Sequence, residues 1–300
     1  MNAGTTGWDA LIGASGLDRL DARALAEHVS QRPRTWLLAH GEEPVPPEQA
    51  RVFEALCLRR AAGEPLAYLT GWREFMGHRF DVGPQVLVPR PETEHLVEAA
   101  LALGDALAPD RALSVLDLGT GSGAIAISLA LARPAWRVMA TDRSPVALAQ
   151  AQRNATRLGV DSMHWRLGSW WEALQTGRRT ASSSLQDGPF VQDGPFDLIL
   201  SNPPYLADDD PHLQHAALKH EPLGALVSGP DGLEAIEIIA QGASSWIAPC
   251  GWLLLEHGFT QGAAARACLT RAGFGSIKTL PDLAGHDRVT LGRWGPSTPV

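Results

Sequence analysis

The first 75 residues carry the hydrophobic spacing of helices. Apolar residues recur three and four positions apart in residues 17–29, and Pro46-Pro47-Glu48 begins a second stretch of this kind that ends at Gly63. Apolar and polar positions do not alternate in this region, so it contains no predicted strand. The pattern indicates a small helical domain over residues 1–75.

A short region with the pattern of strands follows. Residues 75–82, with Gly77 in a turn, and the apolar residues 86–88 predict a β-hairpin. We expect this hairpin, over residues 76–90, to link the helical domain to a second domain at residues 91–300.

From about residue 91, apolar runs alternate with helical segments. The predicted strands are residues 114–118, 136–140, 164–167, 196–201, 251–256, 276–280 and 288–294. Helices separate the first six strands, so βαβ units and a mostly parallel sheet covered on both faces are expected. Residues 281–287 are too few for a crossover helix, so the last two strands should pair antiparallel. The second domain is therefore predicted to be α/β, with a seven-stranded sheet.

The composition is that of an ordinary globular protein. The chain has 300 residues, of which 45% are apolar and 19% are charged. This length suffices for about two domains with a hydrophobic core. The net charge of −8 and the pI near 5.7 argue against a protein that binds nucleic acid mainly by neutralising phosphates.

The sequence gives no sign of export or of a membrane anchor. The first seven residues have neither the basic nor the apolar segment of a secretory signal, and no apolar stretch approaches the ~18 residues of a membrane span. Cys57, Cys250 and Cys268 are far apart and form no C-x-x-C pair, so neither a disulfide framework nor a zinc site is indicated. We expect a cytoplasmic protein with reduced cysteines.

A glycine-rich loop stands between the strand at residues 114–118 and a helix at residues 124–131. Its candidate cofactor-binding residues are Asp117, Gly119, Thr120, Gly121, Ser122 and Gly123. Glycines let the backbone turn sharply and let a ligand approach closely. Asp142, at the end of the next strand, can accept hydrogen bonds from both hydroxyls of a ribose.

Two kinds of cofactor are compatible with this loop. Gly119, Gly121 and Ala124 satisfy the dinucleotide pattern G-x-G-x-x-G/A. Asp117 lies two residues before the first glycine, which gives the pattern D-x-G-x-G-x-G that is typical of methyltransferases. Since no partner for hydride transfer is evident, we favour S-adenosyl-L-methionine over NAD.

Two adjacent tryptophans follow the strand at residues 164–167. An aromatic ring at this edge of the sheet can stack on adenine, although either ring could instead close the hydrophobic core. We assign Trp170 to the adenine and Trp171 to the core.

The residues Asn202-Pro203-Pro204-Tyr205 come directly after the apolar strand at residues 196–201. Open α/β sheets bind their ligands at the carboxyl ends of the strands. There the Asn202 side-chain oxygen can accept a hydrogen bond from a planar amide or amino group, the prolines hold the backbone rigidly, and the Tyr205 ring can cover the flat face of the substrate. The motif predicts a catalytic and substrate-binding clamp, with Asn202 also beside the cofactor.

Three further features have an ordinary structural explanation beside a functional one. Asp208-Asp209-Asp210 and three nearby histidines lack the spacing of a metal site, so no metal is expected. Arg90, Glu92 and Thr93 could contact cofactor or substrate, or could form the start of a helix, and both explanations stay open. Residues 177–195 contain a short internal duplication and are expected to form a mobile surface loop that is dispensable for chemistry.

These motifs, in this order, resemble the HemK/PrmC family of protein N(5)-glutamine methyltransferases, which modify peptide chain release factors. Other stretches that are similar to the family are residues 71–75, 88–94, 210–213, 221–223, 255–258 and 288–292. The resemblance implies a Rossmann-like, seven-stranded class I methyltransferase sheet with S-adenosyl-L-methionine as the cofactor. It also implies methyl transfer to the glutamine of a Gly-Gly-Gln motif in a release factor, which the helical domain would help to dock.

The alternative is a nucleic-acid methyltransferase that acts on the exocyclic amino group of adenine or guanine. Such an enzyme would hold the amino group in a similar way after the base is flipped out of its stack. These enzymes usually carry a basic face or an added recognition domain, whereas this chain is acidic. We therefore favour a protein substrate, with no direct nucleic-acid partner and no membrane partner.

Overall fold

The computed structural model describes residues 6–109, 111–175 and 194–295. These residues form two compact units. The first unit comprises Met1–Trp72, Val82–Pro84 and Pro211–Glu221, and the second comprises Arg73–Asp81, Gln85–Asp210 and Pro222–Val300. The domain division at residues 1–75, 76–90 and 91–300 stays a prediction.

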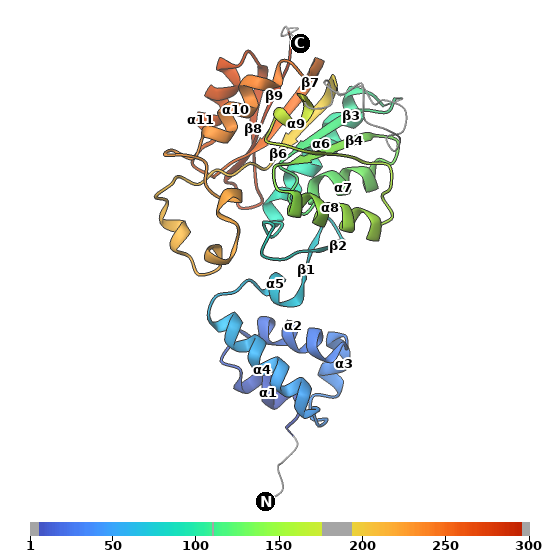
Figure 1. The fold of residues 1–300 in the computed structure, drawn as a ribbon, viewed down its shortest axis with the longest axis vertical. Coiled ribbons are helices and arrows are strands. Elements are labelled where there is room, and N and C mark those ends of the chain that lie inside the picture. The colour runs from blue at the N-terminus through green and yellow to red at the C-terminus, as the bar shows by residue number, and fades with distance from the viewer. Residues whose placement is uncertain (1–5, 110, 176–193, 296–300) are drawn as a thin grey trace, which may run out of the picture. The chain divides into compact units, whose positions relative to one another are not determined.

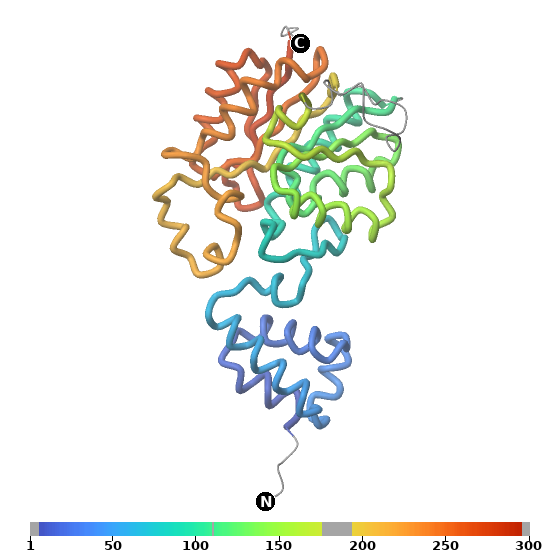
Figure 2. Tube along the Cα trace, in the orientation of Figure 1, coloured from blue at the N-terminus to red at the C-terminus, as the bar shows by residue number. Residues whose placement is uncertain are grey.

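The first unit is helical, as predicted (Figure 2, blue). Its helices are α1 (Trp8–Ala14), α2 (Arg19–Ser30), α3 (Arg34–Ala39), α4 (Pro47–Ala61) and α5 (Leu66–Thr70). Asp18 caps α2 by accepting a hydrogen bond from Leu20 N at 2.8 Å. Trp8 of α1 packs edge-on against Phe53 of α4, with 5.7 Å between the ring centroids. The longer helices α2 and α4 cover the two segments that the spacing predicted.

A segment that is distant in sequence completes this unit. Pro211–Gln214 and Leu218–His220 form two 3₁₀ turns that belong with the N-terminal helices. Gly63, with φ +98°, leaves room for this segment, because a Cβ at this position would lie 2.4 Å from the Cβ of Ala216.

The predicted hairpin is present, but one of its expected segments is not a strand. β1 (Trp72–Phe75) and β2 (His78–Asp81) pair across the turn Met76-Gly77, so the first strand begins within the range predicted to be helical. Residues 86–88 lie in an irregular segment. They stand between Pro84 and Pro89, which have no N–H group to give to a sheet, and this explains why the strand prediction is wrong there.

The second unit is built on a seven-stranded sheet in the order β5-β4-β3-β6-β7-β9-β8 (Figure 1). Its strands are β3 (Ser114–Leu118), β4 (Arg137–Asp142), β5 (His164–Leu167), β6 (Phe196–Ser201), β7 (Ile247–Glu256), β8 (Gly275–Pro281) and β9 (Asp287–Arg293). The five strands from β3 to β7 pair in parallel, and β9 runs antiparallel between β7 and β8. The predicted seven strands and their antiparallel last pair are confirmed.

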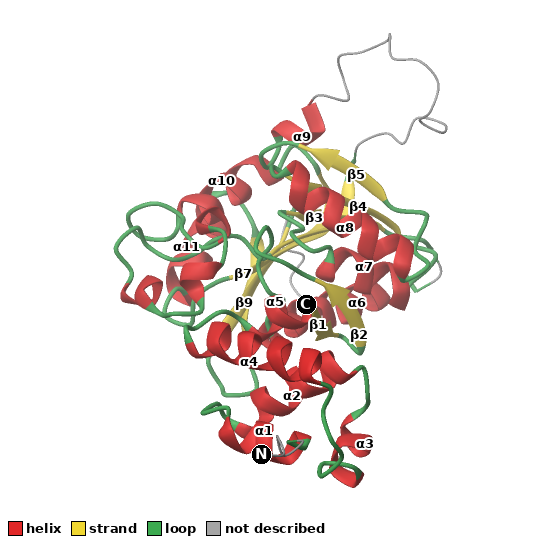
Figure 3. Ribbon diagram, turned by 60° about the horizontal axis from the view of Figure 1, so that its bottom comes forward, coloured by secondary structure: helices red, strands yellow, loops and turns green. Residues whose placement is uncertain are grey.

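Helices cover both faces of this sheet (Figures 1 and 3). One layer consists of α6 (Glu94–Leu107), α7 (Ala124–Ala132) and α8 (Pro145–Arg157), and the other contains α9 (Glu172–Gln175), α10 (Glu234–Ala243) and α11 (Gly262–Arg271). Successive strand residues feed opposite layers, because side chains alternate along a strand. Thus Val115 and Leu198 pack in the first layer, whereas Leu116 and Ile199 pack in the second.

The strand order reverses between β3 and β6. The chain passes from β3 to β4 on one side, and β6 pairs with β3 on the other. Ser201 Oγ at the end of β6 donates to Leu118 O at the end of β3, at 2.7 Å. Ligands bind beyond the carboxyl ends of the strands at such a reversal, so this edge is the expected position of the site.

An ion pair joins the opposite ends of β3 and β6. Asp197 accepts hydrogen bonds from Arg111 Nη1 at 2.9 Å, from Arg111 Nη2 at 2.6 Å and from Ser114 N at 2.9 Å. Burial by itself would raise the pKa of Asp197, but these donors outweigh burial and hold the pKa below its ordinary value.

Replacing Asp197 should therefore destabilise the sheet. We expect Asp197→Ala to lower the free energy of unfolding by about 2 kcal/mol at pH 7, because a buried acceptor of charged hydrogen bonds is lost. A lowered pKa stabilises the fold only while the carboxylate is charged, so the difference should narrow as the pH falls below the ordinary Asp value of about 3.9. Urea unfolding of both proteins measures the effect.

Asp105→Ala is the matched control. Asp105 pairs with Arg133 in the same two-pronged way, but both side chains are exposed. Equal losses in the two variants would contradict a special role for Asp197.

Candidate active site

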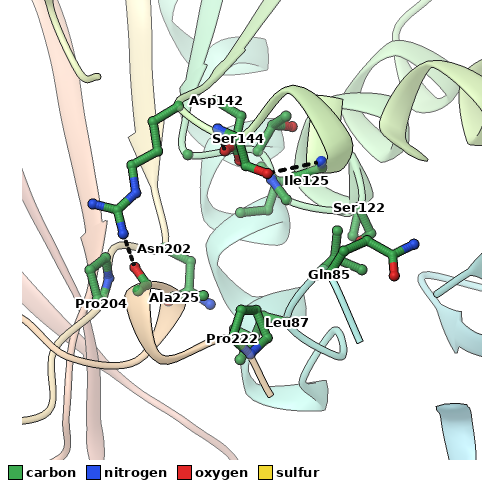
Figure 4. A pocket seen from close by; sticks show the side chains of 18 of the residues that line it. Gln85, Leu87, Ser122, Ile125, Asp142, Ser144, Asn202, Pro204, Pro222 and Ala225 are labelled. Carbon is green, nitrogen blue, oxygen red and sulfur yellow. Dashed lines mark hydrogen bonds between the residues drawn. The ribbon is translucent and has the colours of Figure 1, made fainter. Parts of the chain in front are cut away.

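A cavity of about 280 Å³ lies at the carboxyl edge of the sheet where the strand order reverses (Figure 4). This volume is near the lower end of small-molecule sites. Its walls come from residues 85–87, Pro89, Thr93, residues 119–122, Ala124, Ile125, residues 142–144, Ala147, residues 168–170, Asn202, Pro204, Pro222, Gly224 and Ala225.

The structure brings most of the predicted site residues to this cavity. Those that line it are Gly119, Thr120, Gly121, Ser122, Asp142, Trp170, Asn202 and Pro204. Gly123, Pro203 and Tyr205 lie next to lining residues in the chain, and Asp117 lies two residues before one, but these four do not form the cavity wall.

The glycine loop has a backbone that only glycine adopts without strain. Gly119, Gly121 and Gly123 have φ values of +74°, +58° and +85°. A Cβ on Gly123 would lie 2.6 Å from Ile127 Cδ1, so this position has no room for a side chain. Gly119 N and Thr120 N both donate to Thr141 O of β4, at 2.9 and 2.8 Å. These bonds fix the loop against the neighbouring strand.

Asp117 holds the loop from the buried side. Its carboxylate is fully buried, and its Oδ2 accepts a hydrogen bond from Thr120 Oγ1 at 2.6 Å. Burial raises the pKa of Asp117 to about 7, although the Thr120 hydroxyl works against this rise. The side chain therefore supports a residue of the cavity wall instead of forming the wall itself.

Asp142 faces the cavity from the end of β4. Its Oδ2 accepts from Gly121 N and its Oδ1 from Ser144 N, both at 2.8 Å. Burial raises the pKa of Asp142 in spite of these donors. Each carboxylate oxygen can accept two hydrogen bonds, so one acceptor position on each oxygen remains for a ligand.

The two tryptophans lie in different surroundings. Trp170, with φ +44°, borders the cavity, and a Cβ on Gly119 would lie 3.5 Å from its ring. Trp171 is buried in the layer of α10, where its Nε1 donates to Ile238 O at 3.0 Å. The indole of Trp171 lies so close to Gly242 that a Cβ there would be 2.1 Å from Nε1. Trp171 thus anchors the turn that presents Trp170.

Asn202 is held by one end of its side-chain amide. Its Nδ2 donates to Thr93 Oγ1 at 3.0 Å. Its Oδ1 is buried and has no hydrogen-bond partner in the parts of the chain that the structure describes. A buried acceptor without a partner is costly, so this oxygen is suited to receive an N–H group from a ligand.

The backbone around Tyr205 is tied to neighbouring loops. Tyr205 N donates to Leu226 O at 3.1 Å, and Gln261 Nε2 donates to Tyr205 O at 2.9 Å. Burial, followed by the nearby carboxyl of Glu256, raises the pKa of the Tyr205 phenol to about 12. The phenol is therefore neutral at physiological pH.

Several residues of the cavity were not identified from the sequence. Residues 85–89 and 222–225 carry no ligand-binding pattern of their own, although parts of both segments fall in stretches similar to the HemK/PrmC family. Arg143 Nη2 donates to Gly224 O at 3.1 Å, which joins two sides of the cavity. Thr93 ends the 3₁₀ turn before α6, as the helix-start explanation requires, and it also lines the cavity and contacts Asn202, while its contact with cofactor or substrate stays a prediction.

The expectation for residues 177–195 concerns a segment outside the described residues, apart from Gly194 and Pro195. Within the described residues, no group of three or more His, Cys, Asp or Glu side chains is placed to hold a metal ion. No helix in the described ranges is long and apolar enough to cross a membrane.

Comparison with known proteins places the chain in a family. Residues 7–71 match the model of the PrmC N-terminal domain, and residues 109–229 match a methyltransferase domain. A release factor glutamine methyltransferase of Bordetella pertussis is 48% identical over 282 residues, which cover 94% of this chain and 97% of that protein. That of Escherichia coli K12 is 42% identical over 281 residues, or 94% of each chain. The chain belongs to the release factor glutamine methyltransferase family.

The chain also shares its fold with a more distant protein. The solved structure of the hMettl16 catalytic domain in complex with MAT2A 3'UTR hairpin 6 has a TM-score of 0.53 and 13% identity, covering 92% of this chain and 94% of that chain. The similarity shows the fold alone. The HemK/PrmC resemblance, the class I methyltransferase fold and dependence on S-adenosyl-L-methionine are confirmed, and the NAD alternative is excluded.

The buried Asp117 generates a prediction about pH. An acid whose pKa is raised in the folded state binds its proton more tightly there, so folding loses stability as the pH rises from about 4 to about 7. Asp117→Asn removes this loss. The difference between the free energies of unfolding, variant minus wild type, should therefore increase by up to roughly 4 kcal/mol between about pH 4 and pH 7.

Urea unfolding at several pH values measures this difference. Asp142 and Glu256 also have raised pKa values, but both remain in the variant, so their contributions cancel in the comparison. Parallel stability curves for the two proteins would show that Asp117 does not titrate in this range.

Proposed function

We propose that this chain transfers a methyl group from S-adenosyl-L-methionine to the side-chain amide nitrogen of the glutamine in the Gly-Gly-Gln motif of peptide chain release factors. The observation that carries the proposal is the buried Oδ1 of Asn202, an acceptor without a partner at the cavity wall. The names of the relatives support the protein substrate. We also propose a cytoplasmic location, since release factors act in translation termination.

The residues around the cavity fit S-adenosyl-L-methionine. The Trp170 ring offers a flat apolar face for adenine, a contact that contributes roughly 1–3 kcal/mol in nucleobase-binding sites. Asp142 has acceptor positions left for the ribose hydroxyls. Gly119 and Gly121 let the loop backbone come close to the ligand. The cofactor supplies an activated methyl group, and the protein supplies binding and orientation.

The acceptor needs more help from the protein than the cofactor does. The nitrogen of a carboxamide is a poor nucleophile, because its lone pair is delocalised into the carbonyl group. We infer that Asn202 Oδ1 accepts one N–H of the glutamine and that the backbone carbonyl of Pro203 accepts the other. These acceptors orient the amide and favour positive charge that develops on its nitrogen. Pro203 and Pro204 have fixed φ angles, so the carbonyl is held rigidly.

Tyr205 completes the clamp. Its ring would pack over the plane of the glutamine amide and help to exclude water.

A nucleobase remains the alternative acceptor, since it too would present an –NH2 group to Asn202. The net charge of −8 supports the protein substrate, because a nucleic acid would be repelled by the field of the whole chain.

Methyl transfer to a purified release factor tests the function directly. Radiolabel from S-adenosyl-L-methionine should enter the wild-type release factor and should be absent when its Gly-Gly-Gln motif is changed to Gly-Gly-Ala. DNA and RNA, incubated in parallel, should stay unlabelled. Label in nucleic acid, or equal label in the two release factors, would overturn the proposal.

Mutations should distinguish the acceptor clamp from the cofactor site. Asn202→Ala should lower kcat by about 100-fold while the Kd for S-adenosyl-L-methionine stays nearly unchanged, because the lost acceptor acts on the substrate amide. Asp142→Ala is the matched variant on the other side of the cavity and should raise that Kd. Calorimetry and single-turnover rates measure both effects. Unchanged turnover in Asn202→Ala would refute the clamp.

A further inference from the structure

A second buried polar residue stands beside Asn202 at the same edge of the sheet. In the pairing of β6 with β7, Ser201 lies opposite Leu255, so the next residues along the two strands are Asn202 and Glu256. Side chains at matching positions of adjacent strands project to the same face. Leu200 and Leu254, two residues earlier, both pack in the layer of α6, and Thr93 directly precedes this helix. Asn202 and Glu256 therefore project toward the side on which Thr93 lies.

Glu256 is buried without a good partner. It is 1% exposed, and neither of its oxygens makes a hydrogen bond of standard geometry among the residues that the structure describes. Burial raises its pKa to about 7, and the hydroxyl of Thr93 opposes this rise. A carboxyl group in such a place costs stability, which points to a role other than stabilising the fold.

The surroundings of Glu256 hold few other polar groups. The charges of Arg288 and Arg90 lower the pKa of Glu256, and the charge of Glu92 raises it. The carboxyl of Glu256 in turn raises the pKa of Tyr205, which lies in the loop after β6. Arg288 donates from Nη2 to Asp282 and from Nη1 to His257 O, while its buried Nε has no hydrogen-bond partner among the described residues. Thr93 is a neighbour of Glu256 that also holds Asn202, so it is the group through which Glu256 can act on the clamp.

The Thr93 hydroxyl has a defined direction. Its oxygen accepts the hydrogen bond from Asn202 Nδ2, so its own hydrogen is available for another acceptor. A carboxyl oxygen of Glu256 is suited to be that acceptor. The series then runs from the amide of Asn202 through the Thr93 hydroxyl to Glu256, with each group donating to the next.

This direction matters because the two ends of a carboxamide have nearly the same size. Packing cannot select between the two flipped orientations of Asn202, and only hydrogen bonds can. In the orientation of the structure, Nδ2 points to Thr93 and Oδ1 is left for a ligand. The flipped side chain would present N–H groups to the N–H groups of a substrate amide, and binding of that amide would be opposed.

We propose that Glu256 is a positioning residue that acts through Thr93 to hold Asn202 with its Oδ1 toward the substrate amide. The inference rests on the proposed function, because it explains how the acceptor of that function is oriented. Glu256 is not a catalytic residue, since it is not part of the cavity wall.

Four variants test this series of hydrogen bonds. Thr93→Val replaces the hydroxyl with a methyl group of similar size, and Thr93→Ser keeps the hydroxyl. Glu256→Met removes the carboxyl at similar volume, whereas Glu256→Gln keeps an acceptor oxygen. We expect Thr93→Val and Glu256→Met each to lower kcat by about 10- to 100-fold, with little change in the KM for S-adenosyl-L-methionine. Thr93→Ser and Glu256→Gln should each lose less than their apolar counterparts.

A double variant shows whether Glu256 acts through Thr93. If it does, the kcat of Thr93→Val combined with Glu256→Met should be no lower than that of the slower single variant. The second change would interrupt a series of hydrogen bonds that the first change has already interrupted. Multiplied losses in the double variant, or full turnover in Glu256→Met, would overturn the proposal. Losses in Thr93→Ser as large as in Thr93→Val would do so too.

A measurement on the protein alone separates this inference from the proposed function. In ¹⁵N NMR of the wild type, the side-chain NH2 of Asn202 should exchange slowly, and this protection should survive in Thr93→Ser and be lost in Thr93→Val and Glu256→Met. If the wild type does not methylate a release factor but shows this pattern, the proposed function fails and the positioning role stands. If methylation occurs and the NH2 signal is unaffected by either apolar variant, the positioning role fails.

Discussion

The parallel pairing of β3 with β6 is the constraint on which the site depends. It brings together two segments that are far apart in the chain, with Asp117 opposite Leu200 and the bond from Ser201 Oγ to Leu118 O beyond them. Because parallel strands end at the same edge, the glycine loop and the Asn202 motif must lie side by side there. Reversal of the strand order at this place leaves the edge open for a ligand. The positions of both halves of the proposed site thus follow from one strand pairing.

The same edge concentrates buried polar groups whose hydrogen bonding is incomplete. Asp117, Asn202 and Glu256 lie at the ends of three neighbouring parallel strands. Asp117 and Glu256 are buried, and so is the side-chain oxygen of Asn202, although burying such groups without full hydrogen bonding costs stability. The rest of the core is apolar and is formed by strand residues whose side chains point alternately to the two helix layers. Stability is therefore given by the two helix-covered faces, which allows the edge to hold groups arranged for binding instead of for stability.

Sequence patterns predicted those parts that depend on local order. Buried strands such as residues 196–201 are marked by continuous apolar runs, and the glycine loop by residues that must adopt positive φ. Patterns were wrong for residues 86–88, where apolar side chains fill a cavity wall and prolines prevent a strand. They also left the role of Thr93 open, because its bond to Asn202 exists only after residues far apart in the chain are brought together. Spacing along the chain carries no information on such a contact.

The proposed clamp at Asn202 selects a chemical group, and other parts of the chain must select the molecule that carries it. An unpaired oxygen at Asn202 accepts from any –NH2, whether it belongs to a base or to a glutamine. The segment Pro211–Glu221 follows this motif closely in the chain and packs with the N-terminal helices, as Gly63 against Ala216 illustrates. That helical unit includes the residues that match the PrmC N-terminal domain. The cavity and the residues that match the PrmC N-terminal domain thus belong to different units, and the chain passes from one unit to the other soon after the Asn202 motif.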